Sequence, residues 1–477
     1  MKKTFYLTTP IFYPNARLHM GHAYTTTLSD VIVRYHKLIG EETYFLTGSD
    51  ENTQKMVDSA RKEGKEPLVF LDGIVENFKE LYGSLAIAYD QFIRTTDTKV
   101  HWPGAQAIWT KLVDAGDIYK KEYEGLYCVG HEAFVTEKDL VDGKCPDHGT
   151  TPEFLKEENY FFKLSRYGDQ IIEKIESDEL QILPASRKNE ILSFLRTGLE
   201  DVSFSRPRKA DWPEGLGIPV PGDESQVMYV WCDALVNYIT ALGFGGDDTL
   251  YQKFWPANVH VIGKDILRFH AAIWPGMLLS AGLPLPKSLL VHGFITSGGK
   301  KMSKTLGNII DPLDLIKEYG GEVVRYYLAR HITPFEDGDI TLESFKELYN
   351  GNLANGLGNV VSRVMTMANA HLDAPVVIEE NTIPEDYKEK MGAFRINEAC
   401  DIVWQWIAKI DQKIAEEKPF AMIKTDPEQA KALIAELARE LYTIGRMLNP
   451  IMPKTSALIK EAVKENKKPE NLFPRKE

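Results

Sequence analysis

The chain has 477 residues, of which 43% are hydrophobic and 26% are charged, a composition typical of a globular protein of two to four domains. Its formal net charge of -13 excludes a wholly basic nucleic-acid coat protein, although local basic patches can still bind nucleic acid. Four cysteines in this length do not form a disulfide framework, so the closely spaced ones are interpreted as thiols or metal ligands.

The first residues do not resemble a signal peptide, because Thr8, Thr9, Pro10 and Pro14 interrupt the apolar stretch. The sequence also contains no run of about 18 apolar residues without charge, as a membrane-spanning helix requires. We therefore expect a cytoplasmic protein.

The first elements predict a parallel α/β sheet. KTFYLTT (3–9) is typical of a buried strand, residues 22–40 of an amphipathic helix that ends at Gly40, and EETYFLTGSDE (41–51) of a second strand with a polar tip. A strand, helix and strand with short connections form a right-handed parallel crossover. Ligands bind beyond the carboxyl ends of such strands, where His19 and Asp50 both lie.

From about residue 118 to 220 the sequence is rich in turn formers and weakly periodic, which predicts an inserted module. Residues 226–239 and 258–279 then each read as a strand followed by a helix. A further strand (287–296) precedes the glycine-containing loop SGGKKMSKT (297–305).

After about residue 345 the pattern predicts a bundle of helices. Two apolar stripes at helical spacing carry this prediction, namely Cys400, Val403, Ile407, Ile410 and Ile414, and Leu433, Leu437, Leu441, Ile444 and Leu448. The lysine-rich end of the chain is expected to be solvated.

Two motifs could hold phosphate. In NARLHMGHAY (15–24), His19 and His22 would share a face in the first turn of a helix, and Gly21 leaves room for a ligand near the backbone. A helix N-terminus attracts anions, and two imidazoles add donors. Taken alone, however, such a pair is more often a surface or core feature.

In GGKKMSKT (298–305), Lys300, Lys301 and Lys304 could close over a polyphosphate, although a lone basic run is usually just solvated. The loop is not a Walker motif, and no G-x-G-x-x-G fingerprint occurs.

Together, an early H-x-G-H and a late K-M-S-K-T resemble the two signatures of class I aminoacyl-tRNA synthetases. The chain is similar to methionyl-tRNA synthetases, in their short bacterial form, over nearly its whole length. The stretches that carry this resemblance are TPIFYPNARLHMGHAY, FLTGSDENTQK, YVWCDALVNY, VIGKDILRFHAAIWP and KMSKTLGN.

The resemblance implies an α/β fold in which an inserted connective domain with a zinc knuckle splits a Rossmann-type parallel sheet, followed by a C-terminal α-helical bundle. The expected boundaries are 1–117 and 221–290 for the two halves of the catalytic domain, 118–220 for the insertion, 291–345 for the lysine loop and stem-contact region, and 346–477 for the helical anticodon-binding domain.

The resemblance also implies a reaction. Methionine and ATP would form methionyl-adenylate and pyrophosphate, and methionine would then pass to the terminal ribose of tRNA(Met), the initiator tRNA included. His19, His22, Lys301 and Lys304 would be catalytic. ATP would be bound by His19, Gly21, His22, Gly263, Asp265, Lys301 and Lys304. Mg²⁺ would bridge the phosphates, and the sequence indicates no protein ligand for it.

Methionine requires an apolar pocket that accepts sulfur and a carboxylate for its ammonium group. By resemblance the site consists of Ile11, Tyr13, Asp50, Trp231, Ala234, Tyr238, Ile266, Phe269 and His270. Leu235 replaces the proline of some family members, so the edge of the pocket is expected to differ. Without the family, these aromatic residues would be interpreted as core.

The insertion contains two C-x-x-H pairs, Cys128 with His131 and Cys145 with His148, which supply the four ligands of a tetrahedral structural Zn²⁺ site. The family often has cysteine at the position of His131, and some members lack the metal. A knuckle held by packing alone is the alternative.

In the helical region, Asn359 and Arg363 lie one turn apart on one predicted helix face. The matching residues of the family contact the anticodon, together with an aromatic residue after proline, here Phe420 in place of the more usual tryptophan.

Three other functions compete with this interpretation. The isoleucyl, valyl and leucyl enzymes need a larger editing insertion, and a cysteinyl enzyme needs an early cysteine, whereas the first here is Cys128. A small nucleotidyltransferase would leave the helical third unexplained. A non-catalytic tRNA-binding paralogue would not need all four histidines and lysines. We expect a monomer, because the chain ends soon after the helical bundle.

Overall fold

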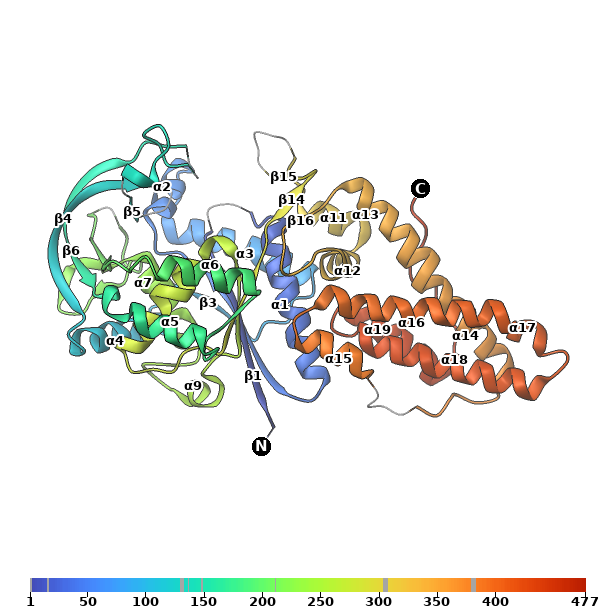
Figure 1. Cartoon of the computed structure of the whole chain (residues 1–477). Coiled ribbons are helices and arrows are strands. Elements are labelled where there is room, and N and C mark those ends of the chain that lie inside the picture. Colours follow the sequence, from blue (N-terminus) through green and yellow to red (C-terminus); the bar gives the residue numbers. More distant parts are fainter. Residues whose placement is uncertain are drawn as a thin grey trace.

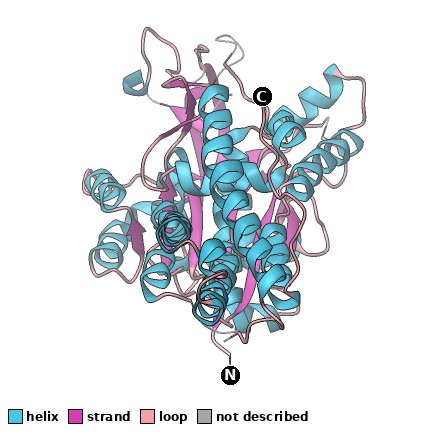
Figure 2. Ribbon diagram, turned by 90° about the vertical axis from the view of Figure 1, so that its right-hand side faces the viewer, coloured by secondary structure: helices cyan, strands magenta, loops and turns pink. Residues whose placement is uncertain are grey.

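The computed structural model describes residues 2–14, 17–128, 133–135, 137–146, 149–210, 212–302, 308–378 and 383–477. Figure 1 shows strands with helices around them in the first two thirds of the chain and helices, several of them long, in the last third. In Figure 2, which views the molecule from the side of the helical bundle, these long helices lie in front of the strands.

A six-stranded parallel sheet forms the centre of the first region, with the strand order β3-β2-β1-β12-β13-β7. Its strands are β1 (Thr4–Phe12), β2 (Glu42–Ser49), β3 (Gln91–Arg94), β7 (Gln181–Leu183), β12 (Val259–Gly263) and β13 (Ser288–His292). The chain builds outward from β1 to β3 and later returns to the other side of β1 at β12. The predicted parallel α/β fold is confirmed.

Helix α1 (Met20–Leu38) connects β1 to β2 and is the crossover that the sequence predicts. Its buried side chains include Leu28, Val31 and Ile32. The helix ends at Leu38 with Ile39 as its C-cap, and Gly40 follows with φ of 90°, a conformation that favours glycine. The helices between β2 and β4 are α2 (Gln54–Lys62), α3 (Pro67–Ser84) and α4 (His101–Asp114).

The segment predicted as an insertion contains two separate kinds of structure. An antiparallel sheet of order β5-β4-β6-β8 is formed by β4 (Ile118–Cys128), β5 (Ala133–Val135), β6 (Glu153–Phe162) and β8 (Val202–Ser203). Between β6 and β8, however, the chain forms α5 (Gly168–Glu176), β7 and α6 (Ala185–Leu195). Since β7 pairs with β13, this part of residues 118–220 completes the central sheet.

Two strands expected in the resumed sheet lie elsewhere. Strand β11 (Asp223–Met228) does lead into α7 (Val230–Leu235), but it pairs antiparallel with β9 (Ser205–Pro207) and β10 (Pro219–Val220). The predicted strand 287–296 divides into β13 and β14 (Ile295–Ser297), and β14 pairs with β15 (Lys300–Lys301) and β16 (Gly338–Asp339). The sequence SGGKK is therefore a hairpin, with its turn at Gly298 and Gly299.

The remaining helices of the first region are short. They are α8 (Asn237–Thr240), α9 (Thr249–Phe254) and α10 (Trp274–Ser280), together with the π-helix η4 (Phe269–Ile273) and the 3-10 helices η1 (Glu137–Asp139), η2 (Leu164–Tyr167) and η3 (Lys264–Ile266).

The last third of the chain is helical, as predicted. It contains α11 (Pro312–Tyr319), α12 (Gly321–His331), α13 (Leu342–Leu348), the π-helix η5 (Tyr349–Gly358), α14 (Asn359–His371), α15 (Glu385–Gly392), α16 (Ile396–Glu417), α17 (Pro419–Met422), α18 (Pro427–Leu448) and α19 (Pro453–Glu465). Every residue of the two predicted apolar stripes is buried, on α16 and α18 respectively. No helix among the described residues combines the length and the apolar character needed to span a membrane.

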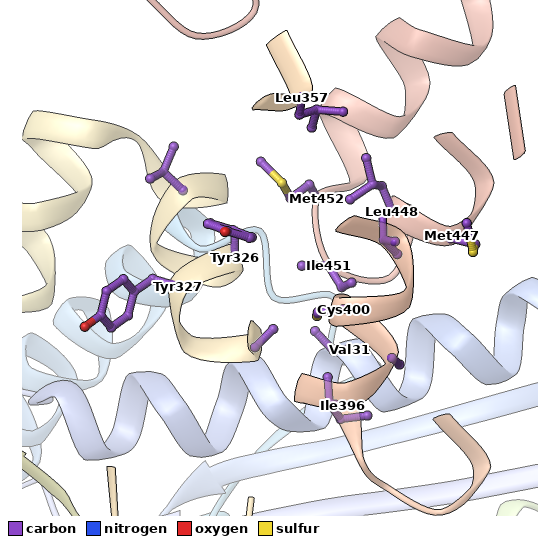
Figure 3. Packing of buried hydrophobic residues seen from close by; sticks show 14 of the residues in the cluster. Val31, Tyr326, Tyr327, Leu357, Ile396, Cys400, Met447, Leu448, Ile451 and Met452 are labelled. Atoms are coloured by element: carbon purple, nitrogen blue, oxygen red, sulfur yellow. The ribbon is translucent and has the colours of Figure 1, made fainter. Parts of the chain in front are cut away.

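One apolar core joins α1 to the helical region. Val31 of α1 lies beside Ile396 and Cys400 of α16 and close to Ile451, which follows α18 (Figure 3). A second core fills the space between the central sheet and the helices that carry the predicted methionine pocket. The helical region is therefore continuous with the helix whose first turn carries His19 and His22.

A buried ion pair lies inside the first core. Arg325 of α12 is 0% exposed, and its guanidinium lies 2.6 Å from the carboxylate of Asp30 on α1. The same guanidinium donates to the carbonyl oxygens of Ile451 (2.8 Å), Pro450 (2.7 Å) and Leu85 (3.1 Å). Arg34 also donates to Asp30, at 2.6 Å. One side chain thus links α1, α12 and the turn between α18 and α19.

We predict that Arg325→Met lowers the free energy of unfolding by about 3–5 kcal/mol, because it leaves a buried carboxylate and three buried carbonyl groups short of a donor. Urea denaturation measures this loss. The control is Arg196→Met, which removes an ion pair to Glu176 whose side chains are 58% and 49% exposed, and which costs under about 1 kcal/mol. Equal losses in the two variants would contradict the role assigned to Arg325.

Candidate active site

The first turn of α1 is capped by its own histidines. His19 is the N-cap residue, and its Nδ1 accepts from the backbone N–H of Gly21 at 3.1 Å. The backbone N–H of His19 in turn donates to Nδ1 of His22, also at 3.1 Å. The two rings lie 3.9 Å apart, and the ring of Phe12 contacts that of His22 edge-on at 4.6 Å. The predicted pair therefore sits at the carboxyl end of β1, at a helix N-terminus.

These caps determine which nitrogen of each ring carries the proton. Since both Nδ1 atoms accept from backbone amides, each neutral ring has its proton on Nε2, which remains as a donor. Desolvation lowers the pKa of His22 well below its ordinary value, and the neighbouring His19 lowers it further. Desolvation also lowers the pKa of His19, against the effect of Asp265 and together with that of Lys301. Both rings are thus held neutral at pH 7, as N–H donors without charge.

Gly21 is required for a reason that the sequence does not reveal. A Cβ at this position would lie 2.9 Å from Cε1 and 3.1 Å from Nδ1 of the His19 ring. Any larger residue would displace the ring that caps the helix. The glycine makes room for the histidine, in addition to any room that it leaves for a ligand.

Asp265 and Lys301 are near enough to His19 to affect its charge. Asp265 lies in η3, directly after β12, and is exposed. A Cβ on Gly263 would lie 2.6 Å from its Oδ1, so Gly263 gives the carboxylate room. Lys301 is exposed on β15 of the hairpin. Lys304, the second predicted catalytic lysine, lies outside the described residues.

The hairpin that carries Lys301 is attached to the sheet region by two carboxylates. Oδ1 of Asp339 accepts from the backbone N–H of Gly299 and from the hydroxyl of Thr296, at 2.8 and 2.7 Å. Lys264, beside Asp265, binds Asp337 at 2.7 Å. These contacts hold the lysine loop next to the end of β12.

The aromatic residues predicted to line the methionine pocket do come together. Trp231 of α7 stacks on Phe269 of η4, with ring centroids 3.7 Å apart and planes at 7°. The ring of His270 contacts that of Trp231 edge-on at 6.4 Å. Tyr238 of α8 binds His270, with its hydroxyl 2.7 Å from Nε2.

His270 has a fixed orientation. Its Nδ1 lies 3.0 Å from the carbonyl oxygen of Ile266, which can only accept, so Nδ1 carries the proton and Nε2 accepts from Tyr238. His270 is 1% exposed, and this burial lowers its pKa to about 4. The imidazole is therefore neutral at pH 7.

The other predicted pocket residues are buried or partly buried. Asp50 directly follows β2, is 4% exposed, and is near enough to Tyr238 for its charge to raise the pKa of that phenol. Its backbone N–H donates to the carbonyl of Phe12 at 3.0 Å. Ile11, Tyr13 and Ile266 are partly buried against the second core, and Ala234 is 4% exposed.

Sequence analysis missed a buried polar network behind this pocket. His101 of α4 is 0% exposed, and its Nε2 donates to Oδ1 of Asp233 at 2.6 Å while its Nδ1 lies 2.8 Å from the hydroxyl of Thr240. The other oxygen of Asp233 accepts from the side-chain amide nitrogen of Asn52 at 2.7 Å, and the side-chain oxygen Oδ1 of Asn52 accepts from the N–H of Gly217 at 3.0 Å. The network fixes α7, which carries Trp231 and Ala234, to the tip of β2, which carries Asp50.

His292, at the end of β13, was also missed. Its Nε2 lies 2.8 Å from the hydroxyl of Thr25 in the second turn of α1, and its Nδ1 donates to the carbonyl of Gly293 at 2.8 Å. Burial lowers the pKa of His292, and its ring contacts that of Tyr24 edge-on at 5.3 Å. The sequence feature that could have indicated His292 is a histidine near the end of a predicted buried strand.

The residues predicted to contact RNA lie on the helical region. Asn359 is the first residue of α14 and is exposed. Arg363 follows one turn later and forms an ion pair with Asp411 of α16. Phe420 lies on α17, which follows α16, and its side chain is 53% exposed. These side chains belong to two helices, α14 and α17, and are at least partly accessible to solvent.

Two of the four predicted zinc ligands can be described. Cys128 ends β4 and is 0% exposed, and Cys145 is 1% exposed. Neither thiol belongs to any of the three apolar cores formed by the described residues. Burial of a thiol outside a core fits a metal ligand. His131 and His148 lie outside the described residues.

The arrangement as a whole suits a nucleotide and a small apolar amine. Two neutral N–H donors lie at a helix N-terminus, which suits a polyphosphate, with a lysine beside them and a carboxylate of the kind that accepts from ribose hydroxyls. The Asp50 carboxylate and the aromatic cluster follow strands of the same sheet. This arrangement can bring the carboxylate of a molecule bound in the aromatic pocket to a phosphate bound at the N-terminus of α1.

Comparisons with known proteins agree with this geometry. Residues 5–150 and 136–365 match the family described as tRNA synthetases class I (M). The chain is 43% identical to the methionine–tRNA ligase of Caldanaerobacter subterraneus subsp. tengcongensis over 471 residues, which cover 95% of this chain and 73% of that protein. It is 40% identical to the methionine–tRNA ligase of Thermotoga maritima over 483 residues, covering 98% of this chain and 76% of the relative.

Solved structures extend the agreement to the whole fold. Mycobacterium tuberculosis methionyl-tRNA synthetase in complex with methionyl-adenylate matches with a TM-score of 0.90 and 32% identity, covering 99% of this chain and 100% of that one. The ligand-free form of the same enzyme matches with a TM-score of 0.84 and 31% identity, covering 100% and 99% of the two chains.

We predict that acid destabilises the protein through His270. Its pKa in the folded state, about 4, lies below the unfolded value of about 6.5, so the unfolded state binds the proton first as pH falls. The stability that depends on a neutral His270 is fully present above pH 6.5 and is lost as the pH falls from 6.5 to 4. The loss of stability amounts to about 2 kcal/mol at pH 5.

Urea denaturation at pH 7, 6 and 5 measures this effect in the wild type and in His270→Gln. The variant is less stable at pH 7, because Tyr238 loses its partner, but its stability falls less steeply with acid. Identical pH slopes in the two proteins would show that His270 is not held neutral.

Proposed function

The chain belongs to the methionine–tRNA ligases of class I, and from that premise we propose which of its residues carry out each step. The protein activates methionine with ATP and joins it to tRNA. The observation that carries the assignment of the catalytic residues is the pair of neutral imidazoles at the N-terminus of α1, with Asp265 and Lys301 beside them.

In the first step, a carboxylate oxygen of methionine attacks the α-phosphorus of ATP. A bond from this oxygen to phosphorus forms while the bond from phosphorus to the bridging oxygen breaks, and pyrophosphate leaves with the negative charge. The Nε2–H groups of His19 and His22 donate to phosphate oxygens, and Lys301 and Lys304 neutralise the leaving pyrophosphate. The catalysis consists of positioning and electrostatic stabilisation. ATP enters with Mg²⁺, which lowers the repulsion between phosphate oxygens.

Neutral histidines suit this step better than charged ones. A proton on Nδ1 of either ring would remove an acceptor from the cap and leave a backbone N–H of the first turn without its partner. The helix would then lose the geometry that points Nε2 at the phosphates. Gly263 and Asp265 complete the nucleotide site, where the carboxylate accepts from ribose hydroxyls.

Asp50 and the aromatic pocket select methionine. The Asp50 carboxylate binds the ammonium group, and Trp231, Phe269 and Tyr238 surround the thioether. Neutral His270 adds no charge to the pocket, so an apolar chain enters without an unpaired ion. Ile11, Tyr13, Ala234 and Ile266 complete the lining.

In the second step, a hydroxyl of the terminal ribose of tRNA attacks the carbonyl carbon of the adenylate, an ester bond forms and AMP leaves. We expect the initiator tRNA to be an acceptor too. Asn359, Arg363 and Phe420 contact the anticodon, the amide and guanidinium through hydrogen bonds and Phe420 by stacking on an unpaired base. The tRNA substrate implies a cytoplasmic site of action.

Zn²⁺ would be held by Cys128, His131, Cys145 and His148. The two described thiols fit it, since they are buried outside the apolar cores in a segment of turns. Cys128 and Cys145 would thereby tie the end of β4 to the turn at Cys145, where the N–H of Gly149 donates to the carbonyl of Cys145 at 2.7 Å.

Methionine-dependent exchange of pyrophosphate into ATP, without tRNA, tests the function. We expect exchange with methionine and much less with leucine, isoleucine, valine or cysteine. His22→Ala lowers kcat about 10²–10³-fold with little change in the KM for methionine, because a donor to the developing charge is lost. Asp50→Asn raises mainly that KM.

No exchange by folded wild-type protein would favour a non-catalytic paralogue. Exchange with a different amino acid would move the assignment within class I. An unchanged kcat in His22→Ala would overturn the role given to the imidazoles.

The zinc site is tested by metal analysis of the purified protein. We expect about one zinc per chain in the wild type, a large loss in Cys145→Ser and a lower melting temperature. Cys400→Ser is the control, since Cys400 is a buried thiol inside the apolar core of the helical region and its variant keeps the metal. Zinc-free wild-type protein, or equal zinc in both variants, would overturn the proposal.

A further inference from the structure

The site proposed for methionine is built from two segments that lie far apart in the sequence. Asp50, the proposed partner of the ammonium group, directly follows β2. Trp231 and Ala234 lie on α7 and Tyr238 lies on α8, where they are proposed to contact the thioether end. The length of side chain that fits between the ammonium and thioether ends therefore depends on the separation of the β2 tip from α7 and α8.

The β2 tip is fixed to the end of β3. Glu51 is 0% exposed, and its carboxylate accepts from Nε of Arg94 at 2.8 Å and from the hydroxyl of Thr96. Its backbone N–H donates to the hydroxyl of Thr95 at 2.8 Å. These bonds tie the residue after Asp50 to β3, so the ammonium end of the site has a fixed position in the sheet.

Helix α7, at the thioether end, is too short to be stable alone. It has six residues, and its N-cap residue makes no side-chain cap bond. Isolated helices of fewer than about 12 residues are marginal in water, so tertiary contacts decide the position of α7. The carboxylate of Asp233, which is 0% exposed, makes two of these contacts. It accepts from His101 at 2.6 Å and from Asn52 at 2.7 Å.

His101 extends the connection to α8. Because its Nε2 donates to Asp233, its Nδ1 is an acceptor, and the hydroxyl of Thr240, 2.8 Å away, is the donor. Thr240 and Tyr238 lie on the same short helix. The helix that carries Tyr238 is thus held by the same imidazole that holds α7.

Asn52 is fixed in three directions. Both hydrogens of its side-chain nitrogen are used, one by Asp233 and one by the carbonyl oxygen of Thr95 at 2.8 Å. Its side-chain oxygen accepts from the N–H of Gly217 at 3.0 Å. Since Asn52 is 4% exposed, a change in its position would leave buried polar groups unpaired, and the charge of one acceptor makes this more costly. The bond to Asp233 is therefore a connection of fixed length between the β2 tip and α7.

We propose that the Asn52–Asp233 bond is a spacer that decides how long a side chain the site accepts, and that Asn52, Asp233 and His101 are positioning residues for the selection of methionine. The proposal rests on the proposed function. These residues act through Asp50 at one end of the site and through the aromatic residues of α7 and α8 at the other. When the spacer is removed, α7 can move away from β2, and a side chain longer by one methylene fits.

Asn52→Ser removes the spacer, and pyrophosphate exchange with methionine, ethionine and norleucine measures the result. Ethionine is longer than methionine by one methylene, whereas norleucine has the same chain length and lacks the sulfur. We expect the wild type to prefer methionine over ethionine by about tenfold or more in kcat/KM, as is typical for one methylene. In Asn52→Ser this preference falls about fivefold or more, while the preference for methionine over norleucine stays within about twofold.

The matched control is Asn350→Ser in the helical region. The side chain of Asn350 also makes two hydrogen bonds, to the N–H and to the carbonyl of Lys476, both at 2.9 Å. Their loss does not reach the methionine site, so the three substrates keep their wild-type ratios. The melting temperature of each variant shows that it is folded under the conditions of the assay.

Two further changes supply a second readout. His101→Ala relaxes the preference over ethionine as Asn52→Ser does, whereas His101→Gln, whose amide can still donate to Asp233, retains most of it. Thr240→Val keeps the volume of the side chain and removes its hydroxyl. We expect a smaller relaxation from it, about two- to threefold, because the imidazole then holds α7 but no longer α8.

The outcomes separate this proposal from the proposed function. If the folded wild type gives no exchange with methionine, the proposed function fails. If it does exchange, and Asn52→Ser, or Thr240→Val where Asn52→Ser is unfolded, keeps the wild-type preference over ethionine, the spacer does not set the accepted length. Equal relaxation toward ethionine and norleucine, or equal relaxation in Asn350→Ser, would show a general loosening of the pocket and overturn the proposal.

Discussion

The parallel pairing of β1 with β12 is the contact on which the active site depends. Leu7 and Thr8 pair with Val259 and His260, residues about 250 positions away in the sequence, and the strand order reverses at this pair. Because carboxyl ends of parallel strands meet at one edge, His19 after β1 and Asp265 after β12 become neighbours. Asp50 follows β2 at the same edge. No local element could bring these groups together.

At that edge, the chemistry of α1 follows from how its first turn is capped. A helix start normally uses a serine, threonine or aspartate to satisfy its free amides. Here imidazoles do so through Nδ1, and each therefore offers its Nε2–H to a ligand. An aspartate cap would repel phosphate, and a serine would not reach beyond the backbone. In each histidine, Nδ1 accepts from the helix backbone and Nε2–H can donate to a ligand, provided that the ring stays neutral.

Sequence periodicity predicts those parts of the fold in which local pattern and tertiary burial agree. The strand–helix–strand at the start and the stripes on α16 and α18 are long enough for their spacing to decide the element. Short strands are harder to place, because the sheet to which a short strand belongs depends on the strands with which it pairs. β7 has three residues and β14 has three, and both lie in sheets that the sequence did not predict for them.

The candidate site likewise contains some residues that the sequence predicts and others that it does not. His19, His22, Lys301 and the aromatic pocket were found through a motif resemblance, and the described ones do come together. The His101–Asp233–Asn52 network was not found, because its members are 132 and 181 positions apart and each looks ordinary in its own segment. The contacts that hold residues 474–476 against η5 were missed for a similar reason. The tail has no periodicity, and its contacts to η5 are between residues 125 or more positions apart.

Helix α1 finally explains how the distant helical region can matter to the chemistry. Its first turn holds the two imidazoles, and three turns later Asp30 binds Arg325, whose guanidinium also binds the turn between α18 and α19. A buried guanidinium with four acceptors has few alternative arrangements, so movement of that turn is transmitted to α1 or breaks the pair. Since α18 also packs on α14 and α17, which carry the side chains proposed to contact RNA, packed helices and a single ion pair would connect the proposed RNA site to the proposed phosphate site.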